Sequence, residues 1–329
     1  MATRRIRANI ERHATAGAFT IARGAKTHVD VVVAEIGEGA EVGRGEATAI
    51  YYRGESAESV LAAIEALIPA LSDGLSREAL QTALPAGAAR NAVDAALWDL
   101  EARSSRRRVW QMLGLAEPRP ILTAYTISLG EPEVMEASAR RVAGRELLKL
   151  KLSGDAGDID RVAAVRRGAP GARIIVDANE SWGGIDIERA AAALVPFRVE
   201  LIEQPVKAGD DRLLDHVASP IPLCADESVH DLASLDHCLG RYQLINIKLD
   251  KAGGLTEALR LQAAARAAGI GVMTGCMLST SLGIAPAFHV AAQGQYADLD
   301  GPLLLAADRA HGMRFEGSDV HPPSAELWG

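Results

Sequence analysis

Five ionisable residues follow short apolar runs at regular intervals between residues 151 and 248, each 22 to 26 residues after the previous one. They are Lys151, Asp177, Glu203, Asp226 and Lys248. In a barrel of alternating strands and helices, the carboxyl ends of the strands meet at one face, where the active sites of such barrels lie. The spacing therefore predicts that these five side chains converge on one site.

Three of the five are carboxylates on successive strands, in the segments "IIVDAN", "LIEQP" and "CADES". Like charges that converge at a partly buried site repel and raise one another's pKa, and a divalent cation removes that cost. Oxygen ligands favour a hard ion, Mg²⁺ first and Mn²⁺ second. The alternative, that each carboxylate caps the helix after it, does not explain three carboxylates in register with flanking lysines.

Lysines flank the carboxylates. Lys149 and Lys151 are two residues apart in "LLKLKL", so they share the strand face opposite the leucines, which is the barrel interior. Two adjacent ammonium groups are expected to lower the pKa of at least one of them, which provides a neutral base; the alternative is an ion-pair network with the carboxylates. Lys248 lies across the barrel, and opposed lysines suit two-base racemisation, with a cation stabilising the enediolate. Lys251 is interpreted as a solvated loop residue.

The elements that must position these residues begin near residue 121, where short apolar runs alternate with amphipathic stretches. Helices are predicted over residues 159–167 and 256–268, among others. Strands are predicted over residues 122–127, 147–152, 173–176, 199–202, 221–224, 244–247 and 271–274 and near Tyr296. Eight strands alternating with helices indicate an α/β fold with a parallel barrel. The last helix is expected to be short or missing, which gives a modified (β/α)7β barrel over residues 116–311.

Residues 1–115 are predicted to form an α+β capping domain, with residues 312–329 packing back on it. A strand over residues 29–36 is expected to pair with residues 41–49 across a glycine turn. Helices are predicted over residues 57–71 and 91–103, and the Gly- and Ala-rich residues 14–26 are interpreted as a loop.

Composition excludes several classes of protein. A net charge of −8, with Arg106, Arg107 and Arg108 as the densest basic run, argues against nucleic-acid binding. No run of about 18 apolar residues is present, so no membrane span is expected. Three cysteines without a Cys-x-x-Cys pair suit a reducing compartment, and the cytoplasm is the expected location. Composition does not decide between a monomer and a homo-oligomer, and both are left open.

The chain resembles the enolase superfamily, in its muconate-lactonising subgroup, over essentially its whole length. The resemblance rests on the five spaced residues, on "LPAGAARNAVDAALWDLEAR" and on "IVDANESW". It implies that Asp177, Glu203 and Asp226 bind a metal ion, that Lys151 and Lys248 are the acid/base pair, and that Lys149 is an auxiliary lysine.

A narrower resemblance, to the dipeptide epimerases, rests on the segments "GCMLSTSLGIAPA", "ADLDGPLLL" and "FTIARGAKTH". It implies a Mg²⁺-dependent isomerase acting on small dipeptides of the L-Ala-D/L-Glu type, in murein peptide metabolism. Asp298 and Asp300 would hold the free ammonium group of the substrate, and Arg23 would pair with its side-chain carboxylate.

Two alternatives stay open. The first is another reaction of the same superfamily, such as N-acyl amino acid racemisation or cycloisomerisation, whose substrates lack an ammonium group. Acid-sugar dehydration is a poorer fit, because the seventh strand ends in Met273, Thr274 and Gly275 with no histidine. A Schiff-base aldolase would not need three carboxylates. The last is a non-catalytic dipeptide-binding protein, which an assay for metal-dependent α-proton exchange would distinguish.

Overall fold

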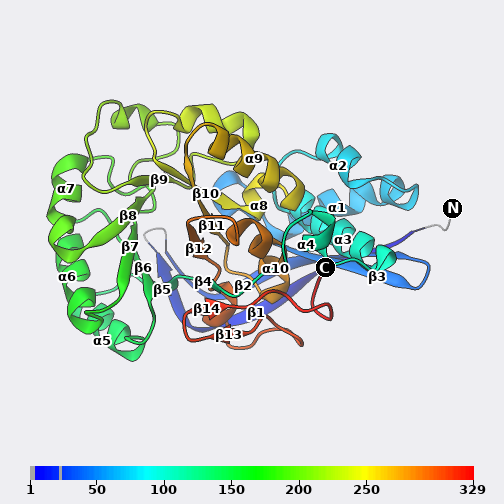
Figure 1. Cartoon of the computed structure of the whole chain (residues 1–329), viewed down its shortest axis with the longest axis horizontal. Helices are drawn as coiled ribbons and strands as arrows, with labels where there is room; N and C mark the ends of the chain where they lie inside the picture. Colours follow the sequence, from blue (N-terminus) through cyan, green and yellow to red (C-terminus); the bar gives the residue numbers. More distant parts are fainter. Residues whose placement is uncertain (1–3, 22–23) are drawn as a thin grey trace.

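The computed structural model describes residues 4–21 and 24–329, and it consists of a small antiparallel sheet covered by helices beside a parallel barrel (Figure 1). In Figure 1 the helices of the first part stand to the right of the barrel, and a long blue hairpin runs from them toward β5. Among the described residues, no helix is both long and apolar enough to cross a membrane.

The first sheet has the order β1 (Arg5–Ile21), β2 (Gly24–Glu38) and β3 (Glu41–Thr48). The predicted pairing of β2 with β3 is confirmed, with Val31 opposite Thr48. The prediction of a loop over residues 14–26 is wrong, because most of this stretch continues the β1–β2 hairpin, with a register shift between Ala14 and Phe19. Glycine and alanine carry too little side chain to display a strand's alternation, which hid the hairpin.

Helices cover this sheet closely. They are η1 (Tyr51–Arg53), α1 (Ala57–Ser72), α2 (Arg77–Ala83), α3 (Ala88–Ser105) and α4 (Val109–Met112). Helix α3 approaches β3 at Gly43 and Gly45, where a Cβ atom would lie only 2.1 Å from the carbonyl oxygens of Ala96 and Ala92. Only glycine permits this approach, which allows the amino-terminal half of α3 to reach the barrel.

The second sheet contains eight parallel strands in sequence order, which confirms the predicted barrel. They are β5 (Tyr125–Ile127), β6 (Leu147–Lys151), β7 (Arg173–Asp177), β8 (Val199–Glu203), β9 (Leu223–Ala225), β10 (Leu244–Lys248), β11 (Gly271–Gly275) and β12 (Tyr296–Asp298). The amide of Ala124, just before β5, donates a hydrogen bond of 2.8 Å to the carbonyl oxygen of Ala297 in β12. This bond links the first and last strands, so the sheet closes on itself.

The outer layer mixes α-helices and 3₁₀ helices. The α-helices are α5 (Pro132–Arg141), α6 (Asp158–Gly168), α7 (Ile187–Leu194), α8 (Leu249–Ala252), α9 (Leu255–Ala267) and α10 (Ser281–Ala291). The 3₁₀ helices are η2 (Val195–Phe197), η3 (Asp211–Leu214), η4 (Leu232–Cys238) and η5 (Gly301–Leu304). Among the described residues only η5 follows β12 before the carboxyl-terminal hairpin, so the last helix is reduced, as predicted.

The predicted strand over residues 122–127 is divided in two. Its first part, β4 (Ile121–Leu122), lies outside the barrel and pairs with β14 (Asp319–Val320), which in turn pairs with β13 (Phe315–Glu316). The chain then ends against α3, where the indole nitrogen of Trp328 donates to the carbonyl oxygen of Ala95 at 3.0 Å. The domain boundaries at residues 115 and 311 stay predictions.

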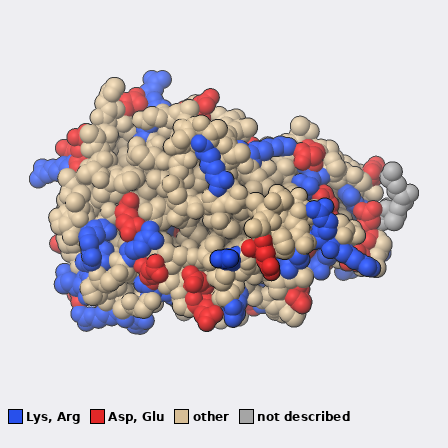
Figure 2. All heavy atoms as spheres, in the orientation of Figure 1, with Lys and Arg blue, Asp and Glu red and all other residues tan. Residues whose placement is uncertain are grey.

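Positive and negative side chains are interspersed on the face drawn in Figure 2, without a continuous basic surface among the residues shown in colour. This distribution matches the acidic composition of the chain. Strong attraction of a polyanion would need a basic stripe or patch instead.

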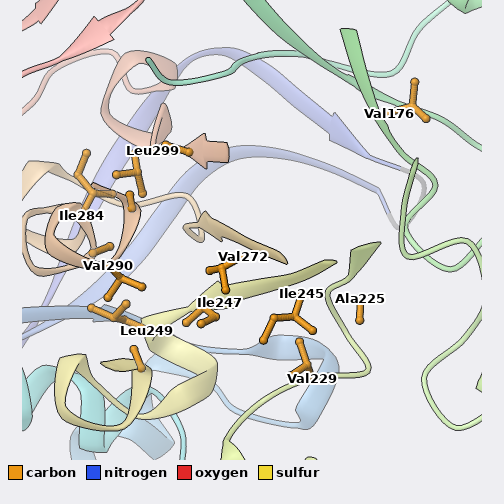
Figure 3. Packing of buried hydrophobic residues seen from close by; sticks show 14 of the residues in the cluster. Val176, Ala225, Val229, Ile245, Ile247, Leu249, Val272, Ile284, Val290 and Leu299 are labelled. Carbon is orange, nitrogen blue, oxygen red and sulfur yellow. The ribbon is translucent and has the colours of Figure 1, made fainter. Parts of the chain in front are cut away.

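Two apolar layers hold the strands in position. Alternate strand residues fill the barrel interior: Ala124, Leu147, Ile175, Leu201, Cys224, Leu244 and Met273. The other strand face packs against the helices, as Figure 3 shows for Ile245, Val272 and Ile284. Leu148, Leu150 and Leu152 belong to this outer layer. Lys149 and Lys151 therefore point into the barrel, as their spacing predicts.

Candidate active site

The five spaced residues meet at one end of the barrel. Lys151, Asp177, Glu203 and Lys248 are the last residues of β6, β7, β8 and β10, and Asp226 follows β9 directly. Register pairs Lys151 with Asp177, and Asp177 with Glu203, across neighbouring strands. All five side chains are buried. The prediction that the strand ends bring them together is confirmed.

Each carboxylate faces a lysine ammonium group. The Nζ atom of Lys151 lies 2.6 Å from Oδ2 of Asp177, and that of Lys248 lies 2.7 Å from Oδ2 of Asp226. The Nζ atom of Lys149 lies 2.6 Å from Oε2 of Glu203. The lysines therefore neutralise the three carboxylates, so an ion-pair network is present.

These contacts set the pKa values of the cluster. Burial opposes the charged form of Lys149, but the carboxylates of Asp298 and Glu203 outweigh burial and hold the pKa of Lys149 well above its ordinary value. Lys149 is therefore not a lysine whose pKa a neighbouring ammonium group lowers, because it faces carboxylates. Burial and the charge of Asp177 raise the pKa of Glu203, to about 7. Burial acts to raise the pKa of Asp177, but Lys151 and Lys149 hold it below its ordinary value.

The donor set fits a hard divalent cation. As the side chains stand, no group of three or more His, Cys, Asp or Glu residues within the described ranges is arranged to hold a metal ion, since ammonium groups lie between the carboxylates. Oε2 of Glu203 is buried and accepts no well-directed hydrogen bond, although the Lys149 ammonium is close. Buried carboxylate oxygens on three adjacent strands are the ligands that Mg²⁺ prefers.

Asp298 and Asp300 extend the cluster. Asp298 ends β12, and its Oδ2 atom lies 2.7 Å from Nζ of Lys149, whereas its Oδ1 atom is buried without a hydrogen bond from the described residues. Oδ2 of Asp300 accepts a hydrogen bond of 2.6 Å from the amide of Thr126. Burial and the charge of Asp298 raise the pKa of Asp300 to about 7. Oδ1 of Asp298 thus retains the capacity to accept a hydrogen bond from a cationic group.

A cavity of about 260 Å³ lies over the strand ends, between the barrel and the first part of the chain. Lys151 and Lys248 both line it, so both can reach one ligand. The described residues around it are Gly24, Ala25, Lys26, Tyr51, Tyr52, Lys151, Asn179, Asp226, Glu227, Lys248, Cys276, Met277 and Leu278. Arg23, predicted to bind the substrate, lies outside the described residues.

The interpretation of Lys251 as a solvated residue is wrong. Its side chain is fully buried, and its Nζ atom lies 2.5 Å from Oδ1 of Asp226 and 3.1 Å from the carbonyl oxygen of Asn246. The short helix α8 begins directly after Lys248 and turns Lys251 back toward Asp226. Because α8 is only four residues long, no helical periodicity in the sequence marks this turn.

Two amides also support the carboxylates and were missed. The side-chain amide of Asn246 donates to Oε1 of Glu203 at 2.8 Å, and Oε1 of Gln204 accepts the backbone N–H of Asp226 at 2.7 Å. Asn246 is two residues before Lys248 on β10, so strand alternation places it on the same inner face. That spacing could have identified it.

The sequence profiles of known families agree with this geometry. Residues 5–114 match the mandelate racemase / muconate lactonizing enzyme amino-terminal domain, and residues 133–318 match the family described as enolase C-terminal domain-like. The chain belongs to the enolase superfamily. Sites of this superfamily use a lysine or histidine base together with Mg²⁺. The lysines and carboxylates at the strand ends are residues of these types.

Several enolase-superfamily proteins resemble this member closely. It is 45% identical to the L-Ala-D/L-Glu epimerase of Escherichia coli, over 92% of this chain and 95% of that protein. It is 46% identical to an N-acetyl-D-glutamate racemase of Pseudoalteromonas, over 75% of this chain and 78% of that protein. A crystal structure of an enolase family member from Agrobacterium tumefaciens, with homology to dipeptide epimerases and with bound sodium and L-Ala-L-Glu, has a TM-score of 0.96 and 51% identity, covering 99% and 100% of the two chains.

Proposed function

We propose that this protein is a dipeptide epimerase, an isomerase that inverts the α-carbon of the second residue in dipeptides of the L-Ala-D/L-Glu type. The observation that carries the proposal is that Lys151 and Lys248 line one cavity. Strands β6 and β10 are four apart in an eight-stranded barrel, so the two lysines approach that cavity from opposite sides. The names of two close relatives, and the L-Ala-L-Glu bound to one of them, support the choice of substrate.

The proposed reaction is a 1,1-proton transfer. One lysine, as a neutral amine, removes the α-proton from one face of the substrate, and the other, as an ammonium ion, delivers a proton to the opposite face. The α-carbon keeps its other three substituents, so only its configuration changes. Lys149 remains paired with Glu203 and Asp298, and its part is to balance their charge.

Asp177, Glu203 and Asp226 would hold Mg²⁺, with Mn²⁺ as the second choice. When bound, the cation would supply positive charge beside these carboxylates and would stabilise the negative charge that develops on the substrate carboxylate as the α-proton is removed. Asn246 and Gln204 keep Glu203 and Asp226 in position by the hydrogen bonds described above.

Asp298 and Asp300 are proposed to bind the free ammonium group of the substrate. Both are buried, and Oδ1 of Asp298 accepts no hydrogen bond from the described residues, which suits a cationic ligand. Arg23 remains the predicted partner of the substrate's side-chain carboxylate. The proposal also includes a role in murein peptide recycling and a location in the cytoplasm, where the free cysteines among the described residues stay reduced; assembly as a homo-oligomer is compatible with it.

The decisive experiment compares substrates in D₂O by mass spectrometry and chiral separation. With Mg²⁺, the wild type is expected to epimerise L-Ala-L-Glu with deuterium incorporation, and N-acetyl-L-Ala-L-Glu should be a poor substrate. Removing one partner of a buried charge pair typically costs about 2–5 kcal/mol. Asp298→Ala combined with Asp300→Ala should therefore lower kcat/KM for the free dipeptide by a factor of about 30 or more. Equal rates for the acetylated and free dipeptides contradict the proposed ammonium site.

A second candidate is racemisation of an N-acylated amino acid, which the similarity to an N-acetyl-D-glutamate racemase favours. That substrate carries no ammonium group, so it would leave the buried Oδ1 atom of Asp298 without a hydrogen-bond donor among the described residues. N-acetyl-L-glutamate therefore belongs in the same assay. Faster turnover of N-acetyl-L-glutamate than of L-Ala-L-Glu would establish this candidate instead.

A further inference from the structure

Lys26 stands in the wall of the cavity opposite the strand ends. It lies near the start of β2, and it lines the same cavity as Lys151 and Lys248. Its Nζ atom lies 4.4 Å from the centroid of the Tyr51 ring, and Tyr51 also lines the cavity. Contact with an aromatic face holds an ammonium group in place without neutralising it. A cation is thus fixed on the side of the cavity that faces the two proposed bases.

The charge of Lys26 has no counter-charge within residues 4–21 and 24–329. Its side chain is half-buried, and burial lowers the pKa of its ammonium group. Glu55 lines a neighbouring cavity together with Lys26, but its two oxygens accept the backbone N–H groups of Ile50, at 2.8 Å, and Ala88, at 3.2 Å. Partial removal of a charge from water is unfavourable unless an opposite charge compensates it.

The other lysines differ from Lys26 in this respect. Lys149, Lys151, Lys248 and Lys251 each lie within ion-pair distance of a carboxylate. Lys207, the remaining lysine, is exposed, and its charge is solvated. Among the described lysines, Lys26 is thus the one that is partly buried and has no carboxylate partner. A partly buried ammonium group without a counter-charge is suited to bind an anionic ligand.

The side-chain carboxylate of the proposed substrate, for which Arg23 is the predicted partner, has no assigned partner among the described residues. Its α-carboxylate belongs beside the metal ligands, and its ammonium group belongs at Asp298 and Asp300. The side chain of the second residue then extends from the α-carbon, between Lys151 and Lys248, toward the capping side of the cavity. Met277 and Leu278 line that space beside Tyr51 and suit the methylene groups of a glutamate.

We propose that Lys26 selects an acidic second residue, by pairing its ammonium group with the side-chain carboxylate of the dipeptide. This inference rests on the proposed dipeptide epimerase function. The Tyr51 ring orients the lysine, and the pairing supplies the counter-charge that the described residues do not. A neutral side chain of the same shape, as in L-Ala-L-Gln, leaves the half-buried ammonium group unpaired and should bind less well.

The test measures binding separately from turnover. Dissociation constants for L-Ala-L-Glu and L-Ala-L-Gln are determined by isothermal titration calorimetry, with Mg²⁺ present, for wild type and for Lys26→Met, Lys26→Arg, Arg23→Met and Lys207→Met. The wild type should prefer L-Ala-L-Glu. Lys26→Met should weaken binding of L-Ala-L-Glu by roughly 30-fold or more, the loss typical of an unpaired group in a desolvated charge pair, and should leave L-Ala-L-Gln nearly unchanged.

The controls separate charge from structure. Lys26→Arg should retain most of the preference for L-Ala-L-Glu over L-Ala-L-Gln. Lys207 is an exposed lysine outside the cavity, so Lys207→Met should retain all of this preference. The inference is overturned if Lys26→Met keeps the wild-type preference, if Arg23→Met alone removes it, or if the wild type has none. Epimerisation of the two dipeptides is measured in parallel. Preferential binding without turnover would contradict the proposed function and still support Lys26 as the selecting residue.

Discussion

The ammonium group of Lys251 lies 2.5 Å from Oδ1 of Asp226, while that of Lys248 lies 2.7 Å from Oδ2 of the same carboxylate. Two lysines from one strand–helix unit therefore hold both oxygens of a proposed metal ligand. Lys251 is fully buried, and its remaining hydrogen bonds go to the backbone carbonyls of Asp226 and Asn246. It cannot reach the cavity, so its role is to fix the orientation of Asp226.

Replacement of Lys251 by methionine should destabilise the protein strongly. Breaking a buried ion pair by removing one partner typically costs about 3–5 kcal/mol, and in this variant Oδ1 of Asp226 loses its ammonium partner while Oδ2 keeps Lys248. Urea unfolding of the metal-free protein, followed by circular dichroism, measures the change. Lys207→Met, at an exposed lysine, is the matched control and should change the free energy of unfolding by much less. A similarly small loss in the free energy of unfolding for both variants would show that the ion pair of Lys251 with Asp226 does not stabilise the fold.

The barrel and the five strand-end residues could be predicted because they depend on local patterns. An apolar run followed by a charged residue, repeated at a nearly constant interval, is visible without any knowledge of tertiary contacts. Lys149 and Lys151 could be assigned to the barrel interior for the same reason, since strand alternation alone decides which face a side chain takes. The separation of Lys151 from Lys248 across the barrel then follows from strand order.

Lys251 and Lys26 could not be placed in this way. Lys251 follows the strand in a polar segment, and only the single turn of α8 shows that its side chain folds back under Asp226. Lys26 lies in a Gly- and Ala-rich stretch without alternation, and its position over Tyr51 depends on a long hairpin that crosses between the two parts of the molecule. Contacts of this kind come from tertiary packing, which sequence periodicity does not encode.

Removal of the divalent cation should abolish epimerisation. Asp177, Glu203 and Asp226 supply only oxygen donors, and metal-ion catalysis typically contributes several kcal/mol to transition-state stabilisation. Dialysis against EDTA should therefore lower turnover of L-Ala-L-Glu about a thousandfold or more, and added Mg²⁺ should restore it. Asp177→Asn should show the same loss without recovery and with unchanged circular dichroism. Undiminished turnover after exhaustive chelation would contradict the metal assignment.

Each proposed base should be needed for inversion but not for proton exchange on its own face. Lys151→Ala and Lys248→Ala should each reduce epimerisation by about 10²–10⁴-fold, the usual contribution of general acid–base catalysis. Each variant should still exchange the α-proton of one isomer, L-Ala-L-Glu or L-Ala-D-Glu, because one lysine remains. The readout is deuterium uptake in D₂O, followed separately for the two isomers.

The two lysine variants should therefore show opposite preferences in exchange. A single-base mechanism predicts a different pattern, in which one variant loses exchange of both isomers and the other loses nothing. Full epimerisation by both variants would show that neither Lys151 nor Lys248 acts as an acid or base in the reaction. The double variant serves as the baseline and should show no enzymatic exchange.

Asp250 should make stability depend on pH. Its Oδ1 atom accepts hydrogen bonds from the backbone N–H of Thr48, at 3.0 Å, and from the side-chain amide of Asn91, at 2.9 Å, which join the barrel to the capping side. Burial raises the pKa of Asp250 to about 7, against the opposing effect of these hydrogen bonds, and the charges of Glu55 and Glu46 add to the rise. The folded protein thus binds this proton more tightly than the unfolded chain, whose ordinary aspartate pKa is 3.8.

The stabilisation associated with this proton is fully present below pH 3.8 and is lost as pH rises to about 7. Asp250→Asn keeps an oxygen acceptor for both hydrogen bonds and carries no charge at any pH. The variant should therefore match the wild type near pH 4 and exceed it in stability at higher pH, by up to about 1.4 kcal/mol for each pH unit of the window. Thermal unfolding of both proteins between pH 4 and pH 8.5 measures the difference, in which groups common to both proteins cancel. A stability difference that does not change with pH would show that the ionisation of Asp250 is not coupled to folding. Asp250→Ala removes the hydrogen-bond acceptor, so it should be less stable than Asp250→Asn at every pH.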